Sequence, residues 1–249
     1  ATDELHFHTL GSKGNPVAYQ SFVNSGIVSG SGMSVRANTV ENSGYLEALY
    51  GPMQIRSSSN VVLRPGGALY SSASDVSIEA ASLYITNHSL YPGRSISLSV
   101  TNHLESGANA WDVYAGFNLL RKPLTGDLAE TSVYDHGFAY SEVLHSWAGV
   151  DRGATEAGFT NNVVLGQLTL DGDVNTLFTF SGTGGAASNA IYIDHLMLAN
   201  EAAGFNAQGG LSQLKINPGM TVYYAQASIN GASVAEFLDG KHNGQLRWV

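Results

Sequence analysis

The segment with the spacing best suited to binding a metal ion is 171–175 (DGDVN). Its side-chain oxygens stand at the first, third and fifth positions, as they do at the start of an EF-hand calcium loop. Further along, the Gly and the bidentate Glu that such a loop requires are both missing. We therefore expect a polar turn here. Binding of Ca²⁺ by Asp171, Asp173 and Asn175 is the alternative, and no other cofactor is expected.

Four aromatic residues are candidates for binding sugars. The flat face of an indole ring offers a surface for the apolar face of a pyranose, and it also packs well in a protein core. Both uses are open for Trp111, Tyr114, Trp147 and Trp248, with Trp111 and Trp147 the preferred glycan-stacking candidates. If either is exposed, it is a candidate glycan-stacking residue.

The densest group of titratable residues is Asp135, His136, Glu142, His145 and Asp151. Carboxylates beside a histidine could serve acid–base chemistry. No Gly-x-Ser-x-Gly motif places a nucleophile near them. We expect these residues to be ordinary polar groups, and we expect the protein not to be an enzyme.

Composition excludes several kinds of partner. The formal net charge is −9 and only 12% of the residues are charged, so no basic surface for nucleic acid or for anionic lipid is expected. Cysteine is absent, which excludes disulfides. No run of 18 apolar residues occurs, so we expect no membrane insertion. A high Gly content with low charge is typical of extracellular repeat proteins.

Short strands with an apolar-polar-apolar pattern recur about every 20 residues, the length of one coil of a solenoid. The first set is centred on Ser34, Gln54, Ser77 and Ser97. A second set contains Val40, Val62 and Ile85, and a third follows Gly-containing turns at Ile27, Tyr45-Leu46 and Ala68-Leu69. Asn38, Asn60 and Asn102 lie at similar positions of the repeat, and asparagines at matching positions could form stacked ladders.

These repeats predict an all-β chain that begins as a parallel β-helix, with a β-sandwich as the alternative. We expect residues 1–107 to form a solenoid of about four coils and residues 108–160 to form an irregular connector. Residues 161–249 are expected to form an antiparallel, sandwich-like part. The main reason for this last expectation is Asp171-Gly172, which is a hairpin signal between two alternating strands.

Segments 21–26 (SFVNSG), 40–44 (VENSG) and 95–102 (SISLSVTN) resemble the repeats of filamentous-haemagglutinin-like β-helices. The chain is also similar to the C-terminal region of large uncharacterised secreted bacterial proteins, in which such coils precede a tail. Segments 117–120 (FNLL), 147–153 (WAGVDRG), 168–173 (LTLDGD) and 245–249 (QLRWV) resemble that tail. The resemblance covers most of the chain and implies an extracellular or cell-surface setting with no known activity.

We expect a secreted structural protein that joins copies of itself into a surface layer or fibre, because open solenoid ends carry unpaired strands. A chain that starts at Ala1 is expected to have lost a signal peptide or to be part of a longer protein. A carbohydrate-binding or adhesive module is the first alternative. A polysaccharide lyase or hydrolase, suggested by analogy of fold alone, is the second.

Overall fold

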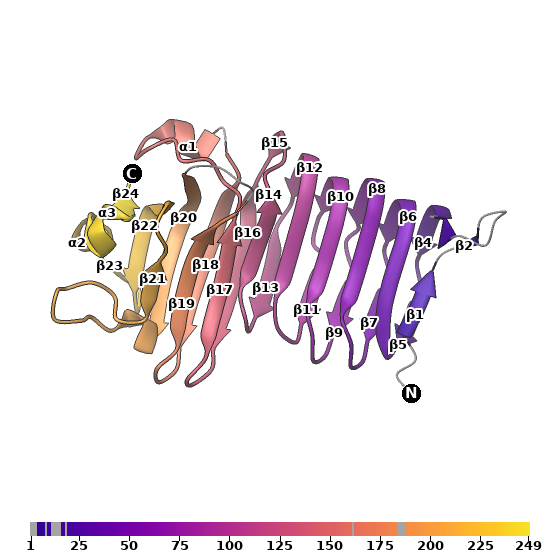
Figure 1. Cartoon of the computed structure of the whole chain (residues 1–249), viewed down its shortest axis with the longest axis horizontal. Helices are drawn as coiled ribbons and strands as arrows, with labels where there is room; N and C mark the ends of the chain where they lie inside the picture. The colour runs from indigo at the N-terminus through magenta and orange to yellow at the C-terminus, as the bar shows by residue number, and fades with distance from the viewer. Residues whose placement is uncertain (1–3, 8, 11–15, 18, 161, 184–187) are drawn as a thin grey trace.

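In the computed structural model, residues 4–7, 9–10, 16–17, 19–160, 162–183 and 188–249 are described, and up to residue 19 only the backbone is. The molecule is elongated, its strands lie side by side along the long axis, and the chain ends lie at opposite ends of that axis (Figure 1). The chain is mostly β-strand with parallel sheets, so the all-β prediction is confirmed. No helix among the described residues is long and apolar enough to cross a membrane.

We call each circuit of the chain a pass. The longest sheet, which we call the long sheet, takes one strand or a pair of short strands from each pass. Its pairings are parallel. It consists of β1 (Glu4–Phe7), β4 (Tyr19–Asn24), β6 (Gly32–Asn42), β8 (Met53–Leu63), β10 (Val76–Ile85), β12 (Ile96–Ser106), β14 (Phe117–Arg121), β15 (Thr125–Gly126), β17 (Glu142–Trp147), β19 (Leu177–Gly182) and β21 (Leu214–Ile216).

Two further parallel sheets follow one another along the molecule and receive the second part of each pass. The short sheet consists of β5 (Ile27–Gly30), β7 (Tyr45–Ala48), β9 (Ala68–Ser71) and β11 (Ser89–Pro92). The C-terminal sheet begins at β13, beside β11. It consists of β13 (Asn109–Val113), β16 (Leu128–Gly137), β18 (Val164–Gly172), β20 (Asn189–Asn200), β22 (Met220–Ile229) and β24 (Leu246–Trp248), with the two-residue β23 (Ala232–Ser233) antiparallel to β22. A small hairpin pairs β2 (Thr9–Leu10) with β3 (Pro16–Val17).

The register of the long sheet follows the first predicted set of repeats. Ser34 pairs with Gln54, Gln54 with Ser77, and Ser77 with Ser97. The second predicted set is displaced by one residue, because each long strand contains a register shift near its middle. Val61, rather than Val62, therefore pairs with Val40 and points into the core.

The prediction of an antiparallel C-terminal part is wrong. β18, β20, β22 and β24 run parallel, as do β17, β19 and β21. Asp171-Gly172 does not close a hairpin, because β18 belongs to the C-terminal sheet and β19 to the long sheet. An alternating pattern reports that one face of a strand is buried; it does not report the direction of the neighbouring strand.

The predicted irregular connector at 108–160 is also wrong for most of its length. Strands β13 to β17 occupy this stretch and pair with the passes on either side. Only the segment after Trp147 leaves the sheets, and it carries the helix α1 (Glu156–Thr160). That segment is fastened to the outer face of the C-terminal sheet by Asp151, which accepts a hydrogen bond from the Tyr223 hydroxyl at 2.9 Å.

The end of the molecule farther from the N-terminus is covered by short helices (Figure 1). These are α2 (Ala235–Leu238) and α3 (Lys241–Gly244). A third short helix, η1 (Glu201–Ala203), follows β20 and contacts β18 and β20. Leu238 of α2 is fully buried, and the Tyr224 hydroxyl donates to the carbonyl oxygen of Ala235 at 2.8 Å. Helix α2 therefore closes the core at this end.

A row of buried polar side chains runs along one interior corner of the passes. The Asn24 side chain donates to Asn42 Oδ1 at 2.8 Å, and Asn109 Nδ2 lies 3.3 Å from Thr131 Oγ1. Between these pairs, His88 Nε2 lies 3.4 Å from Asn42 Nδ2 and His88 Nδ1 lies 2.8 Å from the Arg64 carbonyl oxygen. A polar ladder is present, in which Asn24 and Asn42 precede corner turns and Asn109 follows one. The predicted Asn38, Asn60 and Asn102 lie outside it, and Asn38 and Asn102 are exposed.

Candidate functional site

Four aromatic side chains, three of them exposed and one half-buried (Tyr114), follow one another where strands of the short and C-terminal sheets end and the chain crosses to the long sheet. Each comes from a different pass. They are Tyr70 on β9, Tyr91 on β11, Tyr114 after β13 and Phe138 after β16. Successive passes stack along the long axis (Figure 1), and the strands that carry or precede these rings are neighbours in that stack. We call the four rings the aromatic row.

The rings in this row contact each other in pairs. The Tyr70 and Tyr91 ring centroids are 6.4 Å apart, with the planes tilted by 60°. Tyr114 and Phe138 are stacked, with centroids 5.6 Å apart and planes within 8° of parallel. Tyr91 is 49% exposed and Phe138 is 58% exposed, so these contacts leave much of each ring open to solvent.

A groove of about 490 Å³ runs between these rings; we call it the aromatic groove. Its lining consists of Tyr70, Ser71, Ser72, Tyr91, Pro92, Gly93, Asp112, Tyr114 and Phe138. Flat apolar faces and scattered hydroxyl and carboxylate groups are the combination that a sugar ring requires, since its faces are apolar and its edge is polar.

A chain of polar contacts borders this groove. His136 Nε2 lies 3.2 Å from Asp112 Oδ1, and His136 Nδ1 lies 3.9 Å from Asp171 Oδ2. Asp171 also accepts hydrogen bonds from the Tyr134 hydroxyl at 2.8 Å and from the Asn200 side chain. Burial, reinforced by the Asp171 carboxylate, raises the pKa of Tyr134 and keeps it a hydrogen-bond donor. The His136 ring stacks on Tyr114 with centroids 5.0 Å apart, which joins this polar chain to the aromatic row.

A second groove of about 420 Å³ continues beyond Phe138; we call it the acidic groove. It is lined by His136, Gly137, Phe138, Asp171, Gly172, Asp173, Asn200 and Glu201. Phe138 belongs to the lining of both grooves, so an extended ligand lying on the aromatic row would pass directly into the acidic groove.

The three residues predicted to bind calcium, Asp171, Asp173 and Asn175, each have different contacts in the structure. Asp171 is engaged by Tyr134 and Asn200 on neighbouring strands. Asp173 accepts from the backbone N–H of Val174 at 2.6 Å within its own turn. Asn175 has a positive φ of 55° in that turn and lines neither groove. Among the described residues, no three His, Asp or Glu side chains gather closely enough to hold a metal ion.

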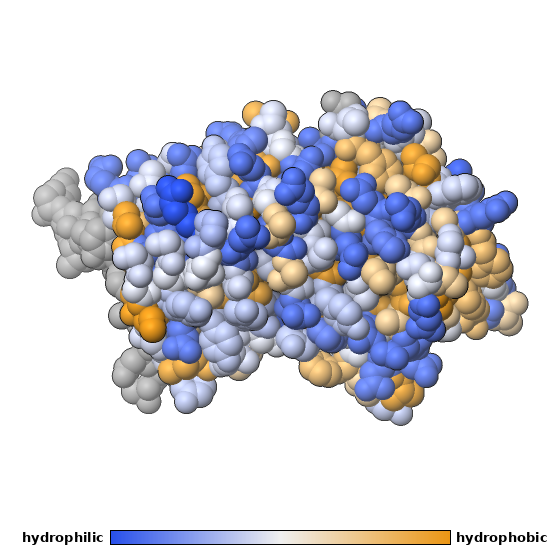
Figure 2. Space-filling view, turned by 180° about the vertical axis from the view of Figure 1, so that it is seen from behind, coloured by the Kyte–Doolittle hydropathy of each residue, from blue (hydrophilic) through white to orange (hydrophobic). Residues whose placement is uncertain are grey.

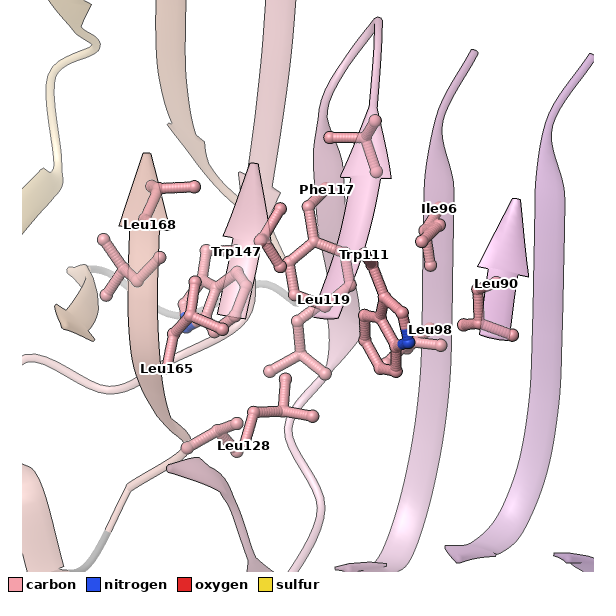
Figure 3. Packing of buried hydrophobic residues seen from close by; sticks show 14 of the residues in the cluster. Leu90, Ile96, Leu98, Trp111, Phe117, Leu119, Leu128, Trp147, Leu165 and Leu168 are labelled. Carbon is pink, nitrogen blue, oxygen red and sulfur yellow. The ribbon is translucent and has the colours of Figure 1, made fainter. Parts of the chain in front are cut away.

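The tryptophans predicted to stack on glycans lie in the core, so that prediction is wrong (Figure 3). Trp111 is 1% exposed and Trp147 is 0% exposed. Phe117 lies between them, with ring centroids 5.7 Å from Trp111 and 5.9 Å from Trp147. Both tryptophans point inward because their strands alternate and these positions are on the inner face.

The titratable residues between 135 and 151 do not all lie on one face, because successive residues of a strand point to opposite faces of the sheet. His136 faces outward beside the grooves, whereas Asp135 and His145 are fully buried, with Oδ2 and Nε2 3.1 Å apart. Burial raises the pKa of Asp135, opposed by the attraction of His145. Glu142 accepts a hydrogen bond from Thr179 at 2.7 Å. No catalytic arrangement joins these residues within the part of the chain that the structure describes.

The aromatic row could be recognised only in part from the sequence. Tyr70 and Tyr91 each follow an inward leucine in the third set of repeats, and they pair in register. Tyr114 and Phe138 lie in turns outside that set. On the face drawn in Figure 2, hydrophobic residues lie in small groups between hydrophilic ones, as expected of a surface in contact with water.

Comparison with known proteins leaves the function to be inferred from this geometry. No protein-family model, curated protein or solved structure matches the chain.

Proposed function

We propose that this chain is an extracellular parallel β-solenoid that binds a polysaccharide along the aromatic groove. The observation that carries this proposal is the row formed by Tyr70, Tyr91, Tyr114 and Phe138, which come from four passes and face one groove. Single exposed aromatic residues are ordinary on a protein surface. Four that line one groove, in contact as two pairs, provide several stacking surfaces for a single extended ligand.

The direction of the row favours a polymer over a free sugar. The groove is open and its four rings come from four successive passes, which stack along the long axis (Figure 1), so it suits a chain that lies lengthwise. Stacking energies of single rings are modest, of order 1 kcal/mol each. A polymer can occupy several rings at once and add these contributions, whereas a monosaccharide cannot.

The test is binding of the purified chain to soluble oligosaccharides and insoluble polysaccharides, compared with the variant Tyr91→Ala/Tyr114→Ala. We expect the variant to bind at least about ten-fold more weakly, because it loses both central stacking surfaces. Tyr45→Ala is the matched control: Tyr45 is 51% exposed on β7 and lines neither groove. Equal retention of wild type and double variant on every glycan would refute the proposal.

Self-assembly is the second candidate, and it is supported by the N-terminal end. Val23 of β4 is 69% exposed and Ile27 of β5 is 75% exposed. Among the described residues, β5 pairs on one side only, with β7. An apolar strand edge favours pairing with another copy of the chain. The opposite end is covered by α2, so this edge supports an end-to-end pair of molecules more than a fibre.

Light scattering over a range of protein concentrations tests self-assembly. A concentration-dependent increase in mass that Ile27→Asp abolishes is the expected result. A particle that stays monomeric at the highest concentration would exclude this candidate and leave polysaccharide binding untouched.

A further inference from the structure

We propose that the polysaccharide bound along the two grooves is an amino-sugar polymer with free ammonium groups, of the polyglucosamine type. This inference rests on the proposed function and adds the charge of the ligand. It is carried by the carboxylates that border the aromatic row and by the composition of both linings.

The acidic side chains are distributed along the whole path of the ligand. Asp112 lines the aromatic groove, while Asp171, Asp173 and Glu201 line the acidic groove. Asp112, Asp173 and Glu201 are exposed, and Asp171 is engaged by Tyr134 and Asn200. Three exposed carboxylates therefore remain able to approach a cation on the ligand.

No Lys or Arg lines either groove among the described residues. The only basic side chain in the two linings is His136, which already lies between Asp112 and Asp171. An acidic polysaccharide would place its carboxylates beside those of the protein with no cation to neutralise them. Like charges at close range disfavour binding, so the grooves select against uronic-acid polymers.

A protonated amino sugar matches both features of the path. Its pyranose face can stack on Tyr91 or Tyr114, and its ammonium group can approach Asp112 at the edge of the same groove. An ammonium group is also attracted to the face of an aromatic ring within about 6 Å. The net charge of −9 adds a long-range attraction for a polycation at low ionic strength.

The experiment is isothermal titration with three oligosaccharides of equal length in one buffer: glucosamine, N-acetylglucosamine and galacturonic acid oligomers. We expect glucosamine oligomers to bind about ten-fold more tightly than the neutral N-acetylated ones at low salt, from two or three partly exposed charge pairs. The galacturonic acid oligomers should bind most weakly. Raising the salt to about 1 M, where the Debye length is about 3 Å, should remove most of the preference.

The variant Asp112→Asn/Glu201→Gln tests the residues. It keeps the shape of both grooves and should lose most of the preference for glucosamine oligomers, while affinity for the N-acetylated ones stays within about two-fold. Glu79→Gln is the control, since Glu79 is exposed on the long sheet and lines neither groove. Unfolding in urea verifies that all variants are folded.

The outcomes separate the two proposals. Equal affinity for glucosamine and N-acetylglucosamine oligomers, with loss of both in Tyr91→Ala/Tyr114→Ala, would overturn the charge inference and retain polysaccharide binding. Tighter binding of galacturonic acid oligomers would also overturn it. Absence of binding to all three ligands would overturn the charge inference, while polysaccharide binding as such is decided by the wider glycan comparison described above.

Discussion

Gly67 and His88 fit against each other at the corner that precedes β9. A Cβ atom added to Gly67 would lie 2.6 Å from His88 Cε1 and 3.0 Å from the Gly44 carbonyl oxygen. The pass that contains β8 and β9 has no asparagine at the position that Asn42 occupies in the preceding pass. The imidazole of His88, from the following pass, lies near that position, between Asn42 and the Arg64 carbonyl oxygen. The absence of a side chain at residue 67 is what admits that ring.

We therefore expect Gly67→Ala to destabilise the protein by about 1–3 kcal/mol, the usual cost of overpacking a tight interior. The free energy of unfolding in urea measures this. Gly26→Ala is the matched control, because a Cβ there would have no atom within 4 Å, and it should stay within about 0.5 kcal/mol of wild type. Equal stability of the two variants would show that the corner rearranges freely.

The buried position of His88 also predicts a dependence of stability on pH. Burial lowers the pKa of His88 in the folded state, opposed by its hydrogen bond to Arg64. The unfolded chain then binds the proton more readily than the folded one. The stability contributed by neutral His88 is present above about pH 6.5, the unfolded pKa, and is lost as the pH falls below it.

The measurement is the free energy of unfolding between pH 8 and pH 5 for wild type and His88→Asn, an asparagine being the usual residue of the ladder. Wild type should lose stability more steeply, by at most about 1.4 kcal/mol per pH unit for one proton. Parallel curves for the two proteins would contradict the prediction.

Asp135 and His145 form a buried pair between the C-terminal and long sheets, with no backbone donor to the Asp135 carboxylate among the described residues. Removing one partner, as in His145→Phe, should cost about 3–5 kcal/mol because the other is left buried and unpaired. The apolar pair Asp135→Leu/His145→Phe should recover most of that loss. A double-mutant cycle in urea measures the coupling; additive effects of the two substitutions would count against a direct interaction.

Trp147 and Tyr91 should respond in opposite ways to truncation. Trp147→Ala removes a fully buried side chain and should cost about 3–5 kcal/mol of stability. Tyr91→Ala removes a half-exposed ring and should change stability by about 1 kcal/mol or less while weakening glycan binding. Unfolding and binding measured on the same preparations test this. A stable Trp147→Ala variant with reduced glycan binding would reverse the assignment of the two residues.

The sequence predicted the stacking register of the first passes well, because inward residues such as Met33, Met53 and Val76 repeat with little interruption. It failed after residue 107, where the passes become longer and the turns differ. Alternation in β18 and β20 was interpreted as antiparallel pairing, although the same alternation serves parallel strands with one buried face. Strand direction depends on which sheet the chain enters next, and a turn dipeptide such as Asp171-Gly172 does not determine that.

Of the aromatic groove, the sequence pointed to Tyr114 alone, for a related reason. Tryptophans were the most conspicuous candidates, yet Trp111 and Trp147 occupy inward positions. The rings that border the groove belong to tyrosines and a phenylalanine at the ends of strands, and their proximity arises from stacking of passes about 20 residues apart. Only an alignment of the passes, including the irregular ones, would have placed them side by side.

Because each ring of the aromatic row belongs to its own pass, the length of the row depends on the number of passes that carry a ring. Duplicating a pass that carries one of these rings would lengthen the row by one ring, and deleting such a pass would shorten it by one. Under the proposed function, the length of polymer bound would then depend on the number of passes that carry a ring. Gene rearrangements that add or remove such passes would then change the length of ligand bound without changing the side chains that contact each sugar.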